Sequence, residues 1–244
     1  MPVATLPLFR DDAYRRDCEA RIVAHNERGG LVLDRTVFYA RGGGQPGDTG
    51  TIRWAGGEVR VTDTVKDGGE ILHVLEEGAA PPPAGTAVTV QLDWDRRHRL
   101  MRTHTALHAL SGVVFTGFGA RVTGGNMEPG SARMDFELDA ISQEFGKEVE
   151  EKLNAALALD RPVRVAFLPR GEALADPDLI RTKVSLIPDH VDPIRVIDIE
   201  GIDRQADGGT HVRSTAEVGT VRVVKTESKG KGFKRMRIEL EEAR

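Results

Sequence analysis

Two histidines four residues apart are the first feature of this sequence that could do chemistry. His104 and His108 lie in the segment Arg-Thr-His-Thr-Ala-Leu-His, residues 102–108. On a helix this spacing projects both imidazoles from one side, where they can bind one metal ion. The pair alone is a weak signal, because such a spacing in a soluble protein is more often accidental.

A second segment offers side chains that would complete such a site. Asp207 and His211 are separated by Gly208, Gly209 and Thr210, and the two glycines let the backbone turn tightly toward a ligand. With the helical pair, they make up a tetrahedral zinc site of three histidines and one aspartate. A hydrolytic zinc site keeps one position for water, so this set must expand to five ligands or release one when it works.

The second half of the chain is predicted to carry these residues on an α+β domain, residues 96–244, with an antiparallel sheet flanked by helices. The first helix bears the histidine pair and buries Leu100, Thr103, Leu107, Leu110 and Val114. A second helix is predicted from Ile141 to Leu159, with Asp139 as its N-cap and Pro162 after its end. Strands are predicted at residues 163–168, 194–199, 218–225 and 233–240, the last two as a hairpin through residues 228–232.

The first 95 residues read instead as short strands interrupted by glycine. The candidates are residues 21–25, 30–40, 50–54, 58–65, 71–75 and 87–92. Their spacing and their lack of helical periodicity predict an all-β domain, either a small barrel or a sandwich.

Composition excludes several functional classes. The 244 residues include 34 Lys and Arg against 38 Asp and Glu, a formal charge of −4, which excludes a generally basic, histone-like mode of nucleic-acid binding but not local basic patches. No apolar run approaches the roughly 18 residues of a membrane span, and residues 1–12 lack a signal pattern. The single cysteine, Cys18, forms neither an internal disulfide nor a cysteine-rich metal site. We therefore expect a cytoplasmic protein with neither a membrane nor DNA as its partner. Because the sequence shows no long C-terminal extension, we also expect a monomer.

The two histidine segments and a glycine-rich segment together resemble a known family. His104-x-x-x-His108, followed by Asp207-Gly-Gly-Thr-His211, is similar to the editing domain of alanyl-tRNA synthetases and their free-standing relatives, the AlaX proteins. Residues 38–50, Phe-Tyr-Ala-Arg-Gly-Gly-Gly-Gln-Pro-Gly-Asp-Thr-Gly, look like the glycine-rich motif of the longer AlaX forms. Residues 229–237 stand in the place of that family's basic terminal hairpin. The resemblance covers nearly the whole chain.

One residue departs from the family pattern. Asp207 stands where the family usually has a cysteine. A carboxylate is a harder ligand than a thiolate, so we expect weaker zinc retention and tolerance for harder ions such as manganese. The alternative is a degraded site in which Asp207 merely caps a turn, leaving a tRNA-binding module without activity.

The resemblance also implies an activity. AlaX proteins hydrolyse wrongly charged alanine tRNA, removing serine and in some cases glycine. A metal held by the four residues could polarise the ester carbonyl, deliver hydroxide, or only anchor the amino-acid pocket. The resemblance further implies that Gln45 orients the ester or the water, and that Thr123 hydrogen-bonds to the serine hydroxyl. The pocket would be completed by Gly43, Gly44, Gly208 and Gly209. The residue types alone leave open a plain turn at residues 42–45 and a strand-edge role for Thr123.

Two basic clusters are the predicted contacts to tRNA phosphates. They comprise Arg96, Arg97, Arg99 and Arg102 in the first, and Lys229, Lys231, Lys234 and Arg235 in the second. A charge run is usually only a solvated face, and the family resemblance is what favours RNA here. A metal-dependent esterase acting on small esters is a further alternative, against which these clusters argue.

Overall fold

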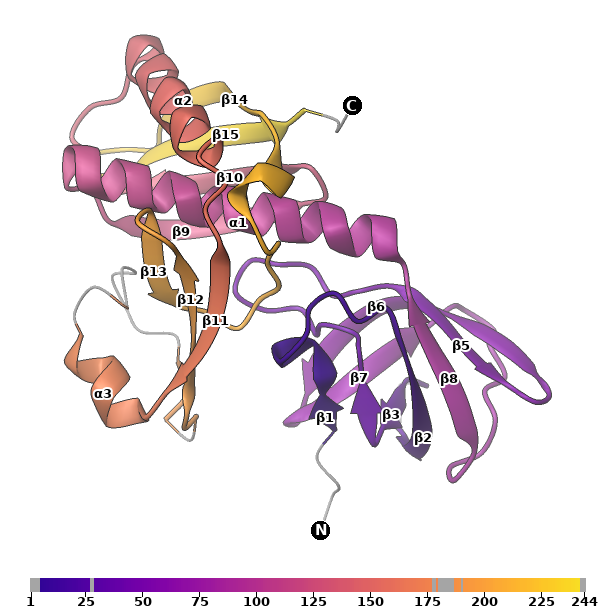
Figure 1. The fold of residues 1–244 in the computed structure, drawn as a ribbon. Helices are drawn as coiled ribbons and strands as arrows, with labels where there is room; N and C mark the ends of the chain where they lie inside the picture. The colour runs from indigo at the N-terminus through magenta and orange to yellow at the C-terminus, as the bar shows by residue number, and fades with distance from the viewer. Residues whose placement is uncertain (1–4, 27–28, 177–178, 180–186, 190, 242–244) are drawn as a thin grey trace. The chain divides into compact units, whose positions relative to one another are not determined.

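The computed structural model describes residues 5–26, 29–176, 179, 187–189 and 191–241, and has the predicted mixed α+β architecture (Figure 1). By its internal contacts the chain divides into two units, residues 1–99 and 100–244. Within the described residues, none of the helices combines the length and the apolar character needed to cross a lipid bilayer.

The strands of the first unit close into a barrel in the order β2-β3-β7-β6-β5-β8, and each strand is antiparallel to its neighbours. Alternate residues point inward, and Ile22, Leu33, Ile52 and Val90 fill the interior. The predicted β-rich domain is therefore a barrel. Its strands are β2 (Asp17–His25), β3 (Leu31–Leu33), β5 (Gly50–Trp54), β6 (Gly57–Asp67), β7 (Glu70–Leu75) and β8 (Ala87–Leu92), and β1 (Leu6–Pro7) pairs in parallel with β4 (Arg35–Thr36) outside it.

The predicted strand at residues 30–40 is in fact broken. It yields only β3 and β4, and residues 37–40 are buried without belonging to a strand. The Thr36 hydroxyl accepts the backbone N–H of Phe38 at 3.0 Å, and the Asp48 carboxylate accepts that of Tyr39 at 2.6 Å. Side chains thus take the place of a neighbouring strand in satisfying the backbone of this segment.

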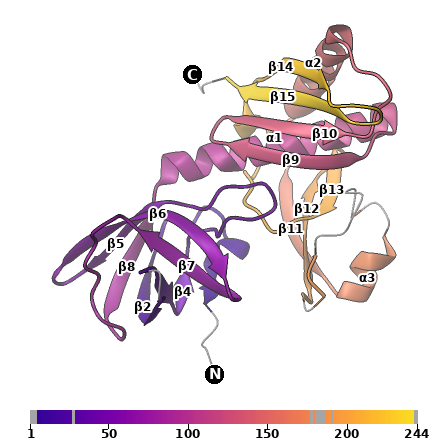
Figure 2. The same cartoon turned by 180° about the vertical axis from the view of Figure 1, so that it is seen from behind.

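The second unit is organised around helix α1 (Trp94–Phe118), which begins in the last residues of the first unit. One sheet has the strand order β14-β15-β10-β9. Helices α1 and α2 (Gln143–Leu157) both lie on one face of this sheet (Figure 1). In the view from behind, the strands lie in front of α1 (Figure 2). A second sheet has the order β11-β12-β13. The strands are β9 (Val122–Glu128), β10 (Ser131–Phe136), β11 (Val163–Leu168), β12 (Ile194–Ile199), β13 (Asp203–Ala206), β14 (Val221–Ser228) and β15 (Lys234–Leu240), and a short α3 spans Arg170–Ala175.

Helix α1 is more deeply buried than its pattern of one apolar face predicts. Between residues 100 and 111 every side chain is buried, including Thr103, Thr105 and Ser111. Elements pack on several sides of this stretch, so polar groups placed there are kept from water and must find partners in the protein. The histidine pair lies in this stretch.

Several predicted boundaries are wrong. Helix α2 begins at Gln143, because the hydroxyl of Ser142 accepts the N–H of Phe145 at 3.1 Å and caps the helix in place of Asp139. Strand β14 begins at Val221, because residues 215–218 form a 3-10 helix. The hairpin β9–β10 was not predicted at all, although the terminal hairpin β14–β15 was.

Gly112 is a position where α1 needs a residue without a side chain. A Cβ there would lie 2.2 Å from the carbonyl oxygen of Ile202, in the turn between β12 and β13. Gly112→Ala should therefore force the turn off the helix and lower the free energy of unfolding by about 1–3 kcal/mol, measured by urea denaturation. Gly117 lies on the same helix with nothing within 4 Å of its Cβ, so Gly117→Ala should raise stability by up to about 1 kcal/mol. Equal responses at the two positions would contradict this packing.

Candidate metal centre

The two histidine segments meet in the second unit. His104 and His108 lie one turn apart on α1, while Asp207 and His211 belong to the loop that follows β13. One ligand atom from each of these four side chains lies within 4.8 Å of the others. The imidazole centroids are 4.3 Å apart for His104 and His211, 4.8 Å for His108 and His211, and 5.1 Å for His104 and His108.

The donor set fits a divalent metal ion. Asp207 Oδ1 lies 3.6 Å from His104 Nε2, and Asp207 Oδ2 lies 3.1 Å from His211 Nε2. Ligands about 2.0–2.2 Å from a tetrahedral ion stand roughly 3.3–3.6 Å from one another. The Asp207 oxygens are already near this spacing from His104 and His211, whereas the widest donor pairs, up to 4.8 Å apart, would move closer together around an ion. Imidazole nitrogens with one carboxylate oxygen suit zinc, and the carboxylate also suits harder ions.

Burial sets the charge states that a metal would require. Burial lowers the pKa of His104 to about 4, although the Asp207 carboxylate opposes the shift. Burial also holds the pKa of His211 well below its usual range, helped by the charges of His104 and His108. For Asp207, burial raises the pKa, but the neighbouring histidines outweigh it, and the pKa is well below its usual value. Neutral imidazoles and an ionised carboxylate are the forms that bind metal.

A buried arginine fixes the loop that carries Asp207. Arg195, on β12, donates from Nη1 to the carbonyl oxygens of Asp207 at 3.0 Å and Gly209 at 2.9 Å. The N–H of Gly209 in turn donates to Asp207 Oδ2 at 2.5 Å. These contacts define the path of residues 207–209, where the sequence indicated only a tight turn at Gly208 and Gly209.

The residues behind the histidines were missed by sequence reasoning. His108 Nδ1 lies 2.9 Å from Asp203 Oδ2, and His211 Nδ1 lies 3.2 Å from the hydroxyl of Thr105. A lone aspartate and a lone threonine carry no motif. The alternation of Asp203, Gln205 and Asp207 along and just beyond β13 is the one signal that could have found the first of them.

The glycine-rich segment lies in the first unit and forms a tight turn. Gly42 and Gln45 exchange backbone hydrogen bonds of 3.1 and 2.9 Å, and the residues between them, Gly43 and Gly44, have φ of +57° and +84°. Two successive positive φ values are what make glycine necessary here. Gln45 is 1% exposed. Its role toward the substrate, like that of Gly43 and Gly44, stays a prediction.

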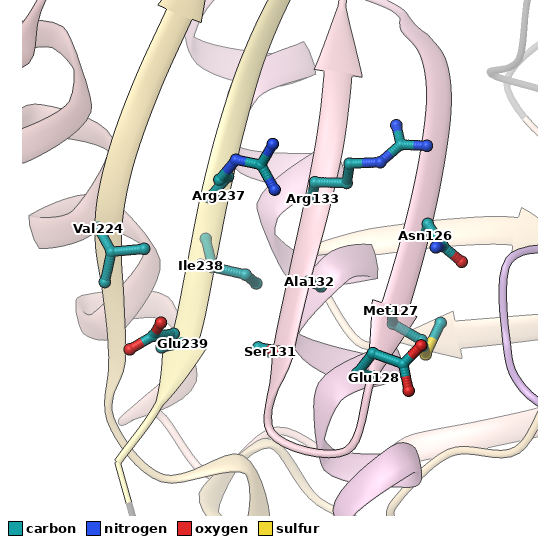
Figure 3. Close-up of a pocket in the computed structure, with 10 residues that line it drawn as sticks. All are labelled: Asn126, Met127, Glu128, Ser131, Ala132, Arg133, Val224, Arg237, Ile238 and Glu239. Carbon is teal, nitrogen blue, oxygen red and sulfur yellow. The ribbon is translucent and has the colours of Figure 1, made fainter.

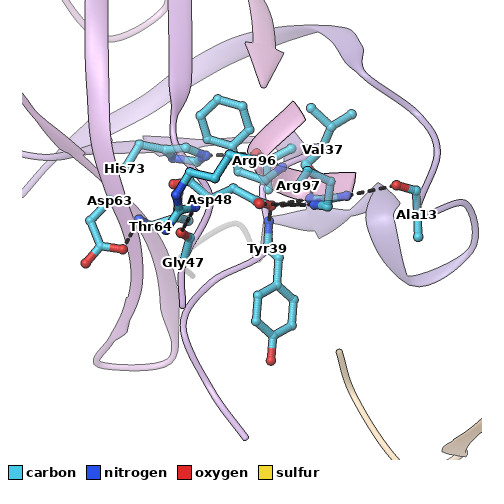
Figure 4. A network of polar contacts seen from close by, with 12 residues as sticks. Ala13, Val37, Tyr39, Gly47, Asp48, Asp63, Thr64, His73, Arg96 and Arg97 are labelled. Atoms are coloured by element: carbon cyan, nitrogen blue, oxygen red, sulfur yellow. Dashed lines mark hydrogen bonds and ion pairs between the residues drawn. The ribbon is translucent and has the colours of Figure 1, made fainter. Parts of the chain in front are cut away.

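The end of this segment is tied to the start of α1 by a buried ion pair (Figure 4). The guanidinium of Arg97 and the carboxylate of Asp48 are both buried and paired through two nitrogens of the arginine. Arg97 also donates to the carbonyl oxygens of Ala13 at 2.9 Å and Val37 at 2.7 Å. The arginine is thus a structural part of the first unit.

The basic residues predicted to contact RNA divide by burial. Arg97, Arg102 and Lys234 are held inside the fold, so their predicted phosphate contacts are not carried further. Arg102 donates to the carbonyl oxygens of Val218 and Glu241, and Lys234 to that of Gly230. The remaining members lie nearer the surface. Arg96 is half-buried and donates to the Gly47 carbonyl, and Arg235 is paired with Asp135. The exposed members are Arg99, Lys229 and Lys231.

Thr123 lies on β9, and its hydroxyl oxygen is buried with no hydrogen-bond partner among the described residues. A separate pocket lies on the sheet, where Arg133 on β10 and Arg237 on β15 are paired in register (Figure 3). That pocket also contains Glu128 and Glu239, and none of the four metal-site residues lines its described part. Its mixed charge does not favour one ligand.

Comparison with known proteins points to one family. The family "Threonyl and Alanyl tRNA synthetase second additional domain" matches residues 194–237, and "tRNA synthetases class II (A)" matches residues 13–96. The alanyl-tRNA editing protein AlaX-M of Saccharolobus solfataricus is 36% identical over 95% of this chain and 97% of its own length. AlaX-M of Methanosarcina barkeri is 35% identical over 95% and 97%. The alanine–tRNA ligase of Pyrobaculum arsenaticum is 36% identical over 91% of this chain and 25% of its own. By this likeness along nearly its whole length, the chain belongs to the AlaX-M family of alanyl-tRNA editing proteins.

Proposed function

We propose that this protein hydrolyses mischarged alanine tRNA in trans. It releases the wrong amino acid from the tRNA, serine above all, with glycine as a second substrate. The observation that carries the proposal is the gathering of His104, His108, His211 and an ionised Asp207 in one buried cluster. AlaX-M relatives that match nearly end to end support it.

The reaction asks for positioning more than for a strong nucleophile. Water adds to the ester carbonyl carbon, the bond from that carbon to the ribose oxygen breaks, and the proton passes to the ribose oxygen. A bound divalent ion, zinc in our proposal, would supply Lewis-acid chemistry at this point. The three imidazoles and the Asp207 carboxylate would hold it, and Arg195 would keep the Asp207 loop in place. We further propose that Gln45 orients the ester or the water.

Exposed basic residues would position the tRNA. Arg99, Lys229 and Lys231 are on the surface, and Lys229 lies 3.7 Å from Glu227. Contacts from such side chains to phosphates position the acceptor end without identifying the tRNA. Binding should therefore weaken steeply as salt increases.

Thr123 is our candidate for recognising the serine hydroxyl. Its buried oxygen lacks a partner among the described residues, and a substrate hydroxyl would supply one that alanine cannot. Thr123→Val should reduce the ratio of deacylation rates, Ser-tRNA over Ala-tRNA, by about tenfold, the worth of one hydrogen bond. Its unfolding free energy should stay the same or rise, because no protein hydrogen bond is lost. Thr123→Ser should keep the ratio, and an unchanged ratio in Thr123→Val would rule the assignment out.

The deciding experiment is deacylation of alanine tRNA charged with serine, glycine or alanine. The protein is first treated with a chelator, and zinc or manganese is then added back. We expect metal-dependent loss of serine with alanine spared. Binding of tRNA without hydrolysis under any metal would leave a tRNA-binding module and overturn the enzymatic proposal. Cleavage of small esters with no salt-sensitive tRNA binding would point instead to a general esterase.

A further inference from the structure

The second ring nitrogen of His108 is held by a carboxylate outside the set of four ligands. Asp203 is the first residue of β13, and its side chain is completely buried. Its Oδ2 lies 2.9 Å from His108 Nδ1. The same oxygen accepts a hydrogen bond of 2.8 Å from Gln205 Nε2.

This contact determines which nitrogen of His108 can bind an ion. An ionised carboxylate can only accept hydrogen bonds, so the proton of the neutral imidazole must be on Nδ1. The lone pair is then on Nε2. The opposite tautomer would set the lone pair of Nδ1 against the oxygen of a buried carboxylate, which is unfavourable where water cannot intervene.

The carboxylate is itself fixed by the helix that carries His108. Gln205 Nε2 lies 3.2 Å from the hydroxyl of Ser111 on α1, so one amide connects the helix to Asp203. Immediately before Asp203, the carbonyl of Ile202 lies close against Gly112 of the same helix. Asp203 therefore has little freedom to move relative to the imidazole that it contacts.

From these contacts we infer that Asp203 is a positioning residue for the metal centre. It holds His108 in the Nδ1–H tautomer with Nε2 available to the ion, and by accepting the hydrogen bond from Nδ1–H it makes Nε2 a stronger electron-pair donor to the metal. The inference rests on the metal centre of the proposed function and adds to it a residue outside the four-ligand set.

Zinc affinity tests the role directly. Competition with a chromophoric chelator should give a dissociation constant about 10–100-fold weaker for Asp203→Ala than for the parent. Asp203→Asn keeps an oxygen that can accept the hydrogen bond from His108 but loses the negative charge. Its zinc affinity should therefore fall by less than that of Asp203→Ala. Asp198→Asn is the matched control, because it removes the same charge from β12, where residue 198 pairs in register with Arg204. Affinities of both Asp203 variants within twofold of the parent would overturn the inference.

A second measurement does not depend on metal or activity. In the metal-free protein at pH 8, a long-range ¹H–¹⁵N correlation spectrum reports which nitrogen of each histidine is protonated. We expect His108 as the Nδ1–H form in the parent and a shift toward the other form in Asp203→Asn. An Nε2–H form in the parent would overturn the inference even if Asp203→Ala fails to fold. A parent that shows the expected tautomer but binds no zinc would instead contradict the proposed centre.

Discussion

Asp207→Ala should abolish tight zinc binding and slow deacylation of mischarged alanine tRNA by more than about 100-fold. Asp207 is the anionic member of the cluster, and burial keeps His104 and His211 neutral there. Its loss would leave a doubly charged ion in a buried site with no anionic ligand bound to it, which is costly. Equilibrium dialysis gives the metal content, and the rate follows from the release of labelled serine.

Asp207→Cys should act in the opposite direction on zinc. The thiolate is a softer donor, so zinc affinity should rise and manganese should support less activity than it does in the parent. Asp198→Ala is the control for both variants, since it removes a carboxylate from β12, the strand next to β13, which precedes the Asp207 loop. Parent-like zinc binding in Asp207→Ala would show that Asp207 only shapes the turn, as its hydrogen bond from Gly209 N–H would allow.

The largest effect on stability is expected at the Arg97–Asp48 pair. Arg97→Met or Asp48→Asn should each lower the free energy of unfolding by about 3–5 kcal/mol, because each leaves the other charge buried without its partner. The double variant should lose less than the sum of the two, since no lone charge remains. Some loss will persist, because the carbonyl oxygens of Ala13 and Val37 lose the donor that Arg97 supplies.

The barrel supplies the matched control for this prediction. Arg53 and Glu58 form an ion pair of 2.8 Å between β5 and β6, with both side chains about half exposed. Arg53→Met should change the unfolding free energy by less than about 1 kcal/mol, as solvent screens such pairs. Urea denaturation measures all four variants. A comparable loss of unfolding free energy in Arg53→Met and Arg97→Met would mean that burial of an ion pair does not determine its contribution to stability.

Patterns that depend on short spacings were predictable from the sequence. The helix of residues 94–118 and the relation of His104 to His108 follow from a period near 3.6, and the barrel strands follow from alternation between glycine-rich turns. The mixed α+β class was confirmed. The meeting of this helix with Asp207 and His211 could not come from spacing, because about a hundred residues separate the two segments. The residue types suggested the joint site, and the family resemblance supported it.

What escaped prediction depends on contacts between distant segments. The strand β9 contains Gly124 and Gly125, which have low strand propensity. It forms because it pairs with β10 from Glu128 to Val122, with one register shift between Asp135 and Phe136. Arg97 belongs to an arginine-rich run that indicates a solvated face, yet its side chain points inward to Asp48, and that of Arg102 is also buried. Asp203 is a single acid whose role exists only once β13 lies against α1.

The distance in sequence between the two pairs of donors has a consequence for the life of the protein in the cell. An ion held by His104, His108, Asp207 and His211 would close a loop of about a hundred residues, so the unfolded chain pays an entropic cost to form the same chelate. Only molecules in which α1 already packs against the loop after β13 would therefore bind the metal tightly. The free metal concentration would then set the fraction of folded molecules by mass action. A shortage of metal would reduce the lifetime of the folded protein as well as its catalytic activity.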